Sequence, residues 1–289
     1  MDAKMIADLI TLPATTPVFS NPKEFGMKYE DVTFQASDGV NLSGWLIEGS
    51  QDKVIIFSHF GLSSSRSGYT PEGKSDGGYE KEINYLKTFR HLVAEGYTVL
   101  TYDFRNHGNS SKGICPWYTG GIEESKDVIA AVDFISNHPV YKDSQIGLLS
   151  FCNGCNSTTY AFGAENGLRN YKNIRALFAM QPIPLAEFLK GFGISEEIIQ
   201  KANEVNIERG GKDLYLSFLP NVKSINIPTM LVQGIGDPWY SKSVIEQYYN
   251  ELTTEKEMFW IDGPKNRLAY YDWFSHSPEK MVEFFKKYI

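Results

Sequence analysis

The clearest indication of the fold is the segment Ile146-Gly147-Leu148-Leu149-Ser150-Phe151-Cys152-Asn153-Gly154. Its first four residues form a short apolar run, which is typical of a strand buried on both faces. A turn follows at once, at 150–154. Catalytic and ligand-binding groups of an open parallel sheet lie at such carboxyl ends of strands. This stretch therefore predicts both an element of the core and a candidate site.

Further strands are predicted on both sides of this stretch. Two period-2 segments come first and are joined by Asp38-Gly39, a hairpin turn. Short β-branched or apolar runs follow, and helical spacing fills most intervals between them. This alternation predicts an α/β fold, a mostly parallel sheet with helices on both faces. The predicted strands are 32–36, 40–47, 54–57, 98–102, 146–149, 174–180, 228–233 and 257–261, and the predicted helices include 79–95, 122–137, 241–252 and 278–288.

Residues 183–224 interrupt this alternation. They contain a helix that begins after Ser195 and ends near Arg209, before Gly210-Gly211. We expect a small helical cap here, inserted between the sixth and seventh strands of a single domain spanning 1–289. The alternative is a helix that packs on the sheet and takes no part in a pocket.

Composition limits the partners of the chain. It has 28 Lys and Arg against 35 Asp and Glu, a net charge of −7, and 42% apolar residues. A basic patch, which nucleic acids and anionic membranes require, is not visible in the sequence. No apolar run approaches the length of a membrane span, and Asp8 and Pro13 interrupt the N-terminal segment. These features predict a cytoplasmic protein without a nucleic-acid or membrane partner, and a homodimer is compatible with them.

The cysteines favour neither a disulfide framework nor a metal site. Three are present, Cys115, Cys152 and Cys155, an odd number in a large chain. Cys152 and Cys155 form a C-x-x-C pair, but no second Cys or His pair lies near it. We therefore expect no metal and no cofactor.

Several turns resemble those of the α/β-hydrolase superfamily. Residues 150–154 resemble its small-x-nucleophile-x-small turn, and 103–110 resemble the D-x-R-x-x-G-x-S segment that follows its fourth strand. Asp237 follows the predicted seventh strand, where the family carries its catalytic acid. Cysteine at the nucleophile position of this turn resembles the dienelactone-hydrolase-like branch, which uses Cys where most of the superfamily uses Ser. The resemblance implies that Cys152 is a nucleophile and Asp237 an acid; otherwise Cys152 is a small buried side chain.

The resemblance also implies an oxyanion hole. The family draws one backbone N–H from the residue after the nucleophile, here Asn153, and another from the loop after the third strand, here Phe60 or Gly61. Phe60 replaces the glycine that is usual there. A thiol at a helix N-terminus also has an increased thiolate fraction, which favours attack on a carbonyl.

The turn that carries the catalytic histidine in the family has none here. Residues 261–268 contain Lys265 and Arg267 instead, which either bind a substrate carboxylate or phosphate or are solvated charges. His276 is the remaining candidate base, about fifteen residues after the eighth strand. It would reach Cys152 if the intervening loop folds back, and otherwise it is a histidine at the start of a helix.

These residues predict a cysteine-dependent acyl hydrolase or acyltransferase. Its substrate would be a small ester, thioester or lactone with an apolar acyl group. A thiolate attacks without a base, whereas hydrolysis of the resulting thioester needs an activated water. The alternative is a non-enzymatic protein of the same fold that binds a small ligand and has lost part of its catalytic set.

Overall fold

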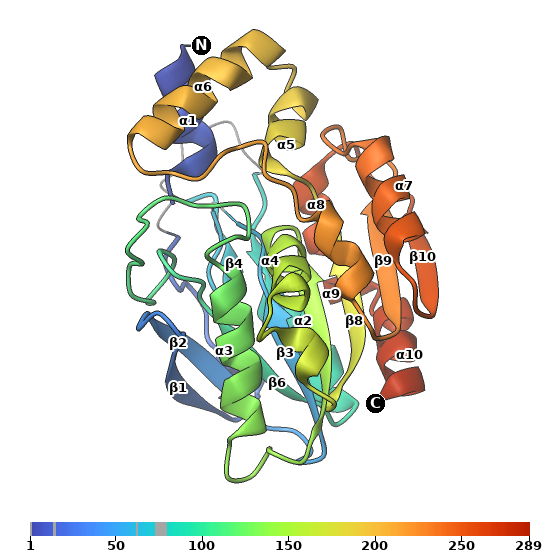
Figure 1. Cartoon of the computed structure of the whole chain (residues 1–289). Coiled ribbons are helices and arrows are strands. Elements are labelled where there is room, and N and C mark those ends of the chain that lie inside the picture. Colours follow the sequence, from blue (N-terminus) through green and yellow to red (C-terminus); the bar gives the residue numbers. More distant parts are fainter. Residues whose placement is uncertain (1, 14–15, 62, 73–79) are drawn as a thin grey trace.

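The protein is described here by a computed structural model that covers residues 2–13, 16–61, 63–72 and 80–289. An eight-stranded sheet forms its centre, in the order β1-β2-β6-β3-β7-β8-β9-β10 (Figure 1). Each predicted strand overlaps one strand of this sheet. The strands are β1 (Tyr29–Gln35), β2 (Asn41–Ile47), β3 (Lys53–Ser58), β6 (Thr98–Tyr102), β7 (Gln145–Phe151), β8 (Ile174–Met180), β9 (Thr229–Gly234) and β10 (Lys256–Ile261).

The sheet is antiparallel at one edge and parallel elsewhere. β1 and β2 form the predicted hairpin, with Gly39 at a φ of 87° in its turn. β2 pairs antiparallel with β6, and every later pairing from β6 to β10 is parallel. Parallel strands align their carboxyl ends, so the turns after β3, β7 and β9 lie at one edge of the sheet.

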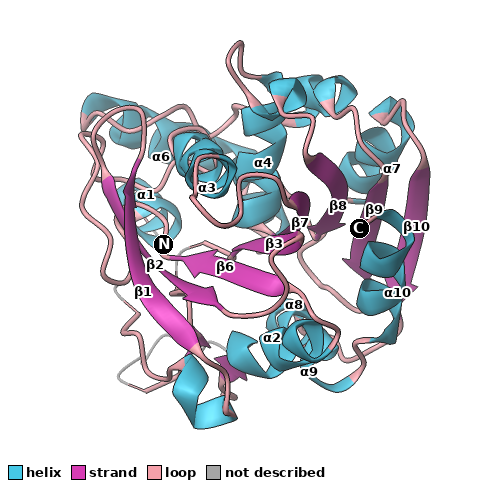
Figure 2. Cartoon of the chain, turned by 90° about the horizontal axis from the view of Figure 1, so that it is seen from below, coloured by secondary structure: helices cyan, strands magenta, loops and turns pink. Residues whose placement is uncertain are grey.

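Helices cover both faces of the sheet, as the sequence predicts (Figure 2). Along β3, Val54 and Ile56 point into one apolar core while Ile55 and Phe57 point into the other. This alternation explains why successive residues from Val54 to Phe57 are all apolar. The first core is covered by α3 (Ser125–Ser136), α4 (Asn153–Gly163) and α7 (Lys242–Glu251), and the second by α2 (Tyr85–Ala94), α8 (Arg267–Tyr271), α9 (Trp273–His276) and α10 (Glu279–Tyr288).

A third apolar core lies in a cap at one end of the sheet (Figure 1). α5 (Leu185–Gly191) and α6 (Glu196–Glu208) come from the interval between β8 and β9. α1 (Ala3–Thr11), which the sequence analysis did not predict, packs against α6 and buries Ile6 and Ile10 in this core. Arg209 fastens α1 by donating to Asp8 Oδ1, at 2.5 Å, and to the Ala7 carbonyl, at 3.0 Å. The cap therefore combines segments from distant parts of the sequence.

The remaining short elements connect these layers. None of the helices in the described ranges is long and apolar enough to cross a membrane. The short elements are β4 (Gly68–Tyr69) and β5 (Ile83–Asn84), which pair antiparallel, and the 3-10 helices η1 (Pro22–Phe25), η2 (Leu168–Asn170) and η3 (Leu219–Ser224).

Candidate active site

Cys152 stands at the turn between β7 and α4, with a φ of 49° and a ψ of −103°. A left-handed φ is rare for a residue with a side chain, so the surrounding contacts must hold it. One of these contacts is the hydrogen bond of 2.8 Å that the Cys152 N–H donates to the Met180 carbonyl. Gly154 lets the turn approach β3, because a Cβ there would lie 2.1 Å from the Ser58 carbonyl oxygen. The sharp, tightly packed turn expected at residues 150–154 is present.

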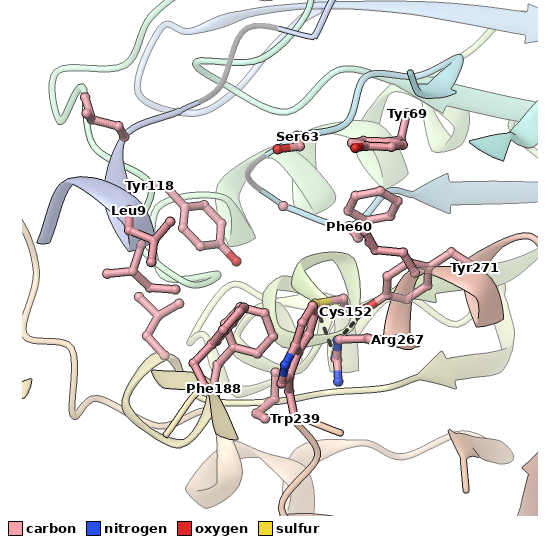
Figure 3. Close-up of a pocket in the computed structure, with 17 residues that line it drawn as sticks. Leu9, Phe60, Ser63, Tyr69, Tyr118, Cys152, Phe188, Trp239, Arg267 and Tyr271 are labelled. Atoms are coloured by element: carbon pink, nitrogen blue, oxygen red, sulfur yellow. Dashed lines mark hydrogen bonds between the residues drawn. The ribbon is translucent and has the colours of Figure 1, made fainter. Parts of the chain in front are cut away.

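A cavity of about 240 Å³ opens onto the Cys152 side chain (Figure 3). Cys152 is partly exposed, so a small molecule in the cavity can reach its sulfur. Apolar and aromatic side chains dominate the lining, and they come from the cap as well as from the sheet turns. They include Leu9, Leu12, Phe60, Leu185, Phe188, Trp239 and Tyr271.

Arg267 joins Cys152 to Asp237. It is the first residue of α8, 1% exposed, and its Nη1 donates to Asp237 Oδ2 at 2.5 Å. Its Nη2 donates to the Cys152 sulfur at 3.5 Å and to the Gln181 carbonyl. Its Nε donates to the Tyr271 hydroxyl at 2.8 Å. Arg267 thus occupies the place between Cys152 and Asp237, the predicted nucleophile and acid, where the resemblance leads one to expect a histidine.

Asp237 is held by several donors besides Arg267. The amide groups of Gln181 and Gln233 donate to Asp237 Oδ2 at 2.9 and 3.1 Å, and the Trp239 N–H donates to Oδ1 at 3.0 Å. These contacts satisfy a carboxylate that is only 3% exposed. Asp237 is therefore a fixed negative charge at the carboxyl end of β9, where the sequence analysis expected the acid.

The surroundings of Arg267 and Tyr271, the two side chains that donate to Cys152, keep both of them protonated. Burial alone lowers the pKa of Arg267, but the negative charge of Asp237 and the neighbouring Tyr271 and Cys152 raise it well above its ordinary value. Burial raises the pKa of the Tyr271 hydroxyl, which also contacts the Cys152 sulfur. A guanidinium has no lone pair with which to accept a proton. Arg267 can orient Cys152 and attract its thiolate, but it cannot act as a base.

Backbone donors expected of an oxyanion hole lie beside Cys152. The Asn153 N–H is the first of α4 and donates to no intrahelical carbonyl. His59 Nε2 accepts from the Phe104 N–H at 3.1 Å, so its Nδ1 carries the proton and donates to the Phe60 carbonyl at 2.6 Å. A trans peptide places its N–H opposite its C=O, so the Gly61 N–H points away from His59. Phe60 and Gly61 both line the cavity with Cys152.

The structure does not bring His276 to this group. Its side chain is 71% exposed, on the short helix α9, and its Nε2 lies 3.3 Å from Asp272 Oδ2. The sequence analysis expected a loop before His276 that could fold back. Residues 267–276 instead form α8 and α9, whose buried side chains, such as Tyr270 and Phe274, fix the direction of the chain. This placement does not support a role as the base.

Three other candidates lie apart from the reacting group. Lys265 is exposed in the turn before α8. Cys155 is buried next to the Tyr248 hydroxyl, and burial raises its pKa to about 12. Cys115 is partly exposed in the loop before Trp117.

Sequence reasoning missed three contributors to the site. Arg267 was expected to bind a substrate anion or solvent, not to connect Cys152 with Asp237. Gln181, with a φ of 51°, and Tyr271 were not singled out. Gln181 follows an apolar strand directly, and a polar residue at the carboxyl end of a parallel strand was an available signal.

Comparison with solved structures establishes the α/β-hydrolase fold. The Pyrococcus furiosus esterase Pf2001 is 24% identical to this chain, with a TM-score of 0.72 over 96% of this chain and 98% of the esterase. The α/β hydrolase GrgF from Penicillium sp. sh18 is 19% identical, with a TM-score of 0.60 over 89% of this chain and 96% of GrgF. At these identities the likeness concerns the fold.

A third solved structure matches this chain over only part of its own length. The Pyrococcus horikoshii acylaminoacyl peptidase is 17% identical, with a TM-score of 0.56, and its match covers 88% of this chain but 41% of the peptidase. No family model matches the sequence, and no curated protein matches it either.

Proposed function

We propose that the protein is a cysteine-dependent acyl-transfer enzyme whose acyl donor is a thioester, or a similarly activated ester, of an apolar acid. The observation that carries this proposal is the Asp237–Arg267–Cys152 group at the floor of an apolar cavity. The esterases and hydrolases of the same fold support the general class of reaction.

The first step uses the thiolate of Cys152. Arg267 Nη2 donates to the sulfur at 3.5 Å, and its positive charge, which Asp237 partly cancels, attracts a thiolate there. The sulfur attacks the carbonyl carbon, a C–S bond forms, and the carbonyl electrons move to oxygen. The N–H groups of Asn153 and Gly61 are suited to stabilise this oxyanion.

The leaving group explains the preference for thioesters. When the intermediate collapses, the bond to the leaving group breaks and that group departs with the electron pair. None of the described residues that line the cavity is a histidine, and Arg267 and Tyr271 hold their protons tightly, so they are poor proton donors to the leaving group. A thiolate or another weakly basic leaving group departs unaided, whereas an alkoxide or amide ion does not. Ordinary alkyl esters and amides are therefore expected to be poor donors.

The second step favours acceptors other than water. Water needs a base to attack the acyl-enzyme, and loss of general-base catalysis costs roughly 10²–10⁴-fold in rate. A thiol or an amine is a stronger nucleophile and depends less on a base. We therefore place acyl transfer ahead of hydrolysis.

An acylation experiment tests this proposal. The protein is mixed with the butyryl thioester of N-acetylcysteamine, released thiol is measured, and the intact mass is recorded. We expect one equivalent of thiol in a burst and a butyryl group on Cys152. Cys152→Ala should remove both signals, whereas Cys115→Ala, a change in a loop outside the cavity, should keep them. A wild-type protein that reacts at another residue, or at none, would contradict the proposal.

One observation favours a second candidate, a protein that binds a small apolar ligand without reaction. Asp237 already pairs with Arg267, which reduces the positive charge available to a thiolate. The same experiment separates the two functions, because a binder takes up the thioester reversibly and releases no thiol.

A further inference from the structure

Tyr118 is a buried phenol on the wall of the cavity opposite the elements that carry the reacting group. It lies in the long connection from β6 to α3, and its side chain is 4% exposed. It lines the same cavity as Cys152 and Arg267. Figure 3 shows its hydroxyl directed into that cavity, on the side toward Cys152.

The Tyr118 hydroxyl is close to the oxyanion loop. A Cβ placed on Gly61 would lie 2.7 Å from the Tyr118 hydroxyl oxygen, so the hydroxyl touches the backbone of that loop. Gly61 is also the residue whose N–H faces away from His59. The phenol and Gly61 therefore lie side by side on the wall of the cavity that Cys152 also lines.

This hydroxyl is a donor without an acceptor. Within the ranges that the structure describes, Tyr118 has no side-chain hydrogen bond, although other buried tyrosines, such as Tyr85 and Tyr248, have one. Burial, and next the negative charge of Cys152, raise the pKa of Tyr118 well above its ordinary value. The phenol thus keeps its proton at neutral pH, and its hydroxyl faces the cavity, where a ligand can accept its hydrogen bond.

The backbone around Tyr118 is fixed in place. The Tyr118 N–H donates to the Thr11 carbonyl at 2.8 Å, which ties it to the end of α1. The next residue, Thr119, donates from its N–H and its hydroxyl to the buried carboxylate of Glu124, at 3.1 and 2.5 Å. A donor held in this way needs little reorganisation when charge develops in front of it.

We propose that the Tyr118 hydroxyl donates a hydrogen bond to the oxyanion that forms when Cys152 attacks the acyl donor. Tyr118 would then be a catalytic residue supplied by the β6–α3 connection and additional to the two backbone donors. It would compensate for a loop that carries Phe60 where the related fold usually has glycine. This inference rests on the proposed acyl-transfer function.

The test compares two reactions of the same sulfur. Acylation by butyryl-N-acetylcysteamine passes through an oxyanion, whereas alkylation by iodoacetamide, a substitution at saturated carbon, does not. Tyr118→Phe removes only the hydroxyl. We expect the acylation rate to fall about 10²-fold, as for loss of one oxyanion donor, and the alkylation rate to stay within twofold of wild type.

A matched control comes from Tyr248→Phe. This change removes a buried hydroxyl that lies 2.9 Å from Thr159 Oγ1, outside the cavity. It should lower the thermal midpoint and leave both rates unchanged. A butyl trifluoromethyl ketone adds a second readout, since Cys152 adds to its carbonyl reversibly and leaves a negative oxygen. Tyr118→Phe should weaken its binding by a similar factor.

Each outcome decides the inference. Equal acylation rates in Tyr118→Phe and wild type would overturn it and leave the proposed function standing. A parallel fall in acylation and alkylation would also overturn it, because Tyr118 would then act on the sulfur. Alkylation of Cys152 in a wild-type protein that no acyl thioester acylates would overturn the proposed function and this inference together.

Discussion

Arg267 makes the contacts expected of the family's catalytic histidine, but it does not transfer protons. It links Asp237 to the Cys152 sulfur, so it fixes the geometry of both groups. It keeps its proton at every accessible pH, so it supplies attraction without proton transfer. Arg267 can therefore assist attack by the Cys152 thiolate, but it cannot activate a water molecule by accepting its proton.

Arg267→His restores a titratable group at this position. A neutral imidazole between Asp237 and Cys152 can accept a proton from water, so the acyl-enzyme should hydrolyse roughly 10²-fold faster or more. The decay of the butyryl adduct on Cys152, followed by intact mass, measures this rate. Arg267→Gln is the control, because it removes the charge and adds no base; its adduct should not decay faster than that of the wild type. A stable adduct in Arg267→His would show that deacylation is limited by something other than the base.

At the scale of the element, Arg209 holds α1 on the cap. Its guanidinium bonds to Asp8, the Ala7 carbonyl and Thr11, and it lies 4.0 Å above the Trp117 ring. These contacts are partly buried, so solvent screens them less than it screens an ion pair on the open surface. Because α1 lines the cavity through Leu9 and Ile10, its attachment also shapes the candidate site.

Arg209→Ala should loosen α1 locally. We expect amide hydrogen exchange in residues 3–11 to accelerate about tenfold or more, while exchange in β6 and β7 stays unchanged. Lys4→Ala is the matched control, since the Lys4 ion pair with the same Asp8 is exposed and contributes at most about 1 kcal/mol. Equal acceleration in both variants would show that the charge balance at Asp8, and not the partly buried contacts of Arg209, determines the stability of α1.

The sequence predicts some helices and strands more accurately than others. The runs 98–102 and 174–180 match β6 and β8 residue for residue, because strands buried on both faces are continuous apolar runs. α1 was missed, since its partner α6 lies about 195 positions away and nothing local marks the contact. The position of Arg267 in the histidine turn was visible, but the direction of its side chain depends on where α8 begins. The same two helices, α8 and α9, turn His276 toward solvent.

The stability of the whole molecule should depend on pH through buried histidines. Burial, and next the neighbouring His107, lower the pKa of His59 from 6.5 to about 3. The unfolded chain therefore binds a proton below pH 6.5 that the folded chain does not bind until about pH 3. Stability from this group is complete above pH 6.5 and is lost as the pH falls.

Urea unfolding at two pH values tests this dependence. Between pH 7 and pH 5, His59 alone should lower the free energy of unfolding by about 2 kcal/mol. The pKa of buried His107 is also lowered, chiefly by burial, which adds to the loss. His59→Asn keeps an N–H donor and removes the titration, so its loss between the two pH values should be smaller. An unchanged free energy in the wild type would mean that these rings are solvated.

The packing of α1 against α6 also determines when α1 can fold during synthesis of the chain. Ribosomes add roughly 5–20 residues per second, so α1 leaves the exit tunnel on the order of 10–40 s before its partner exists. During that interval its buried positions, Ile6 and Ile10, have no native neighbour, and chaperones could engage them. The wall of the cavity would be among the last parts of the molecule to close, after the sheet strands up to β8 have been made.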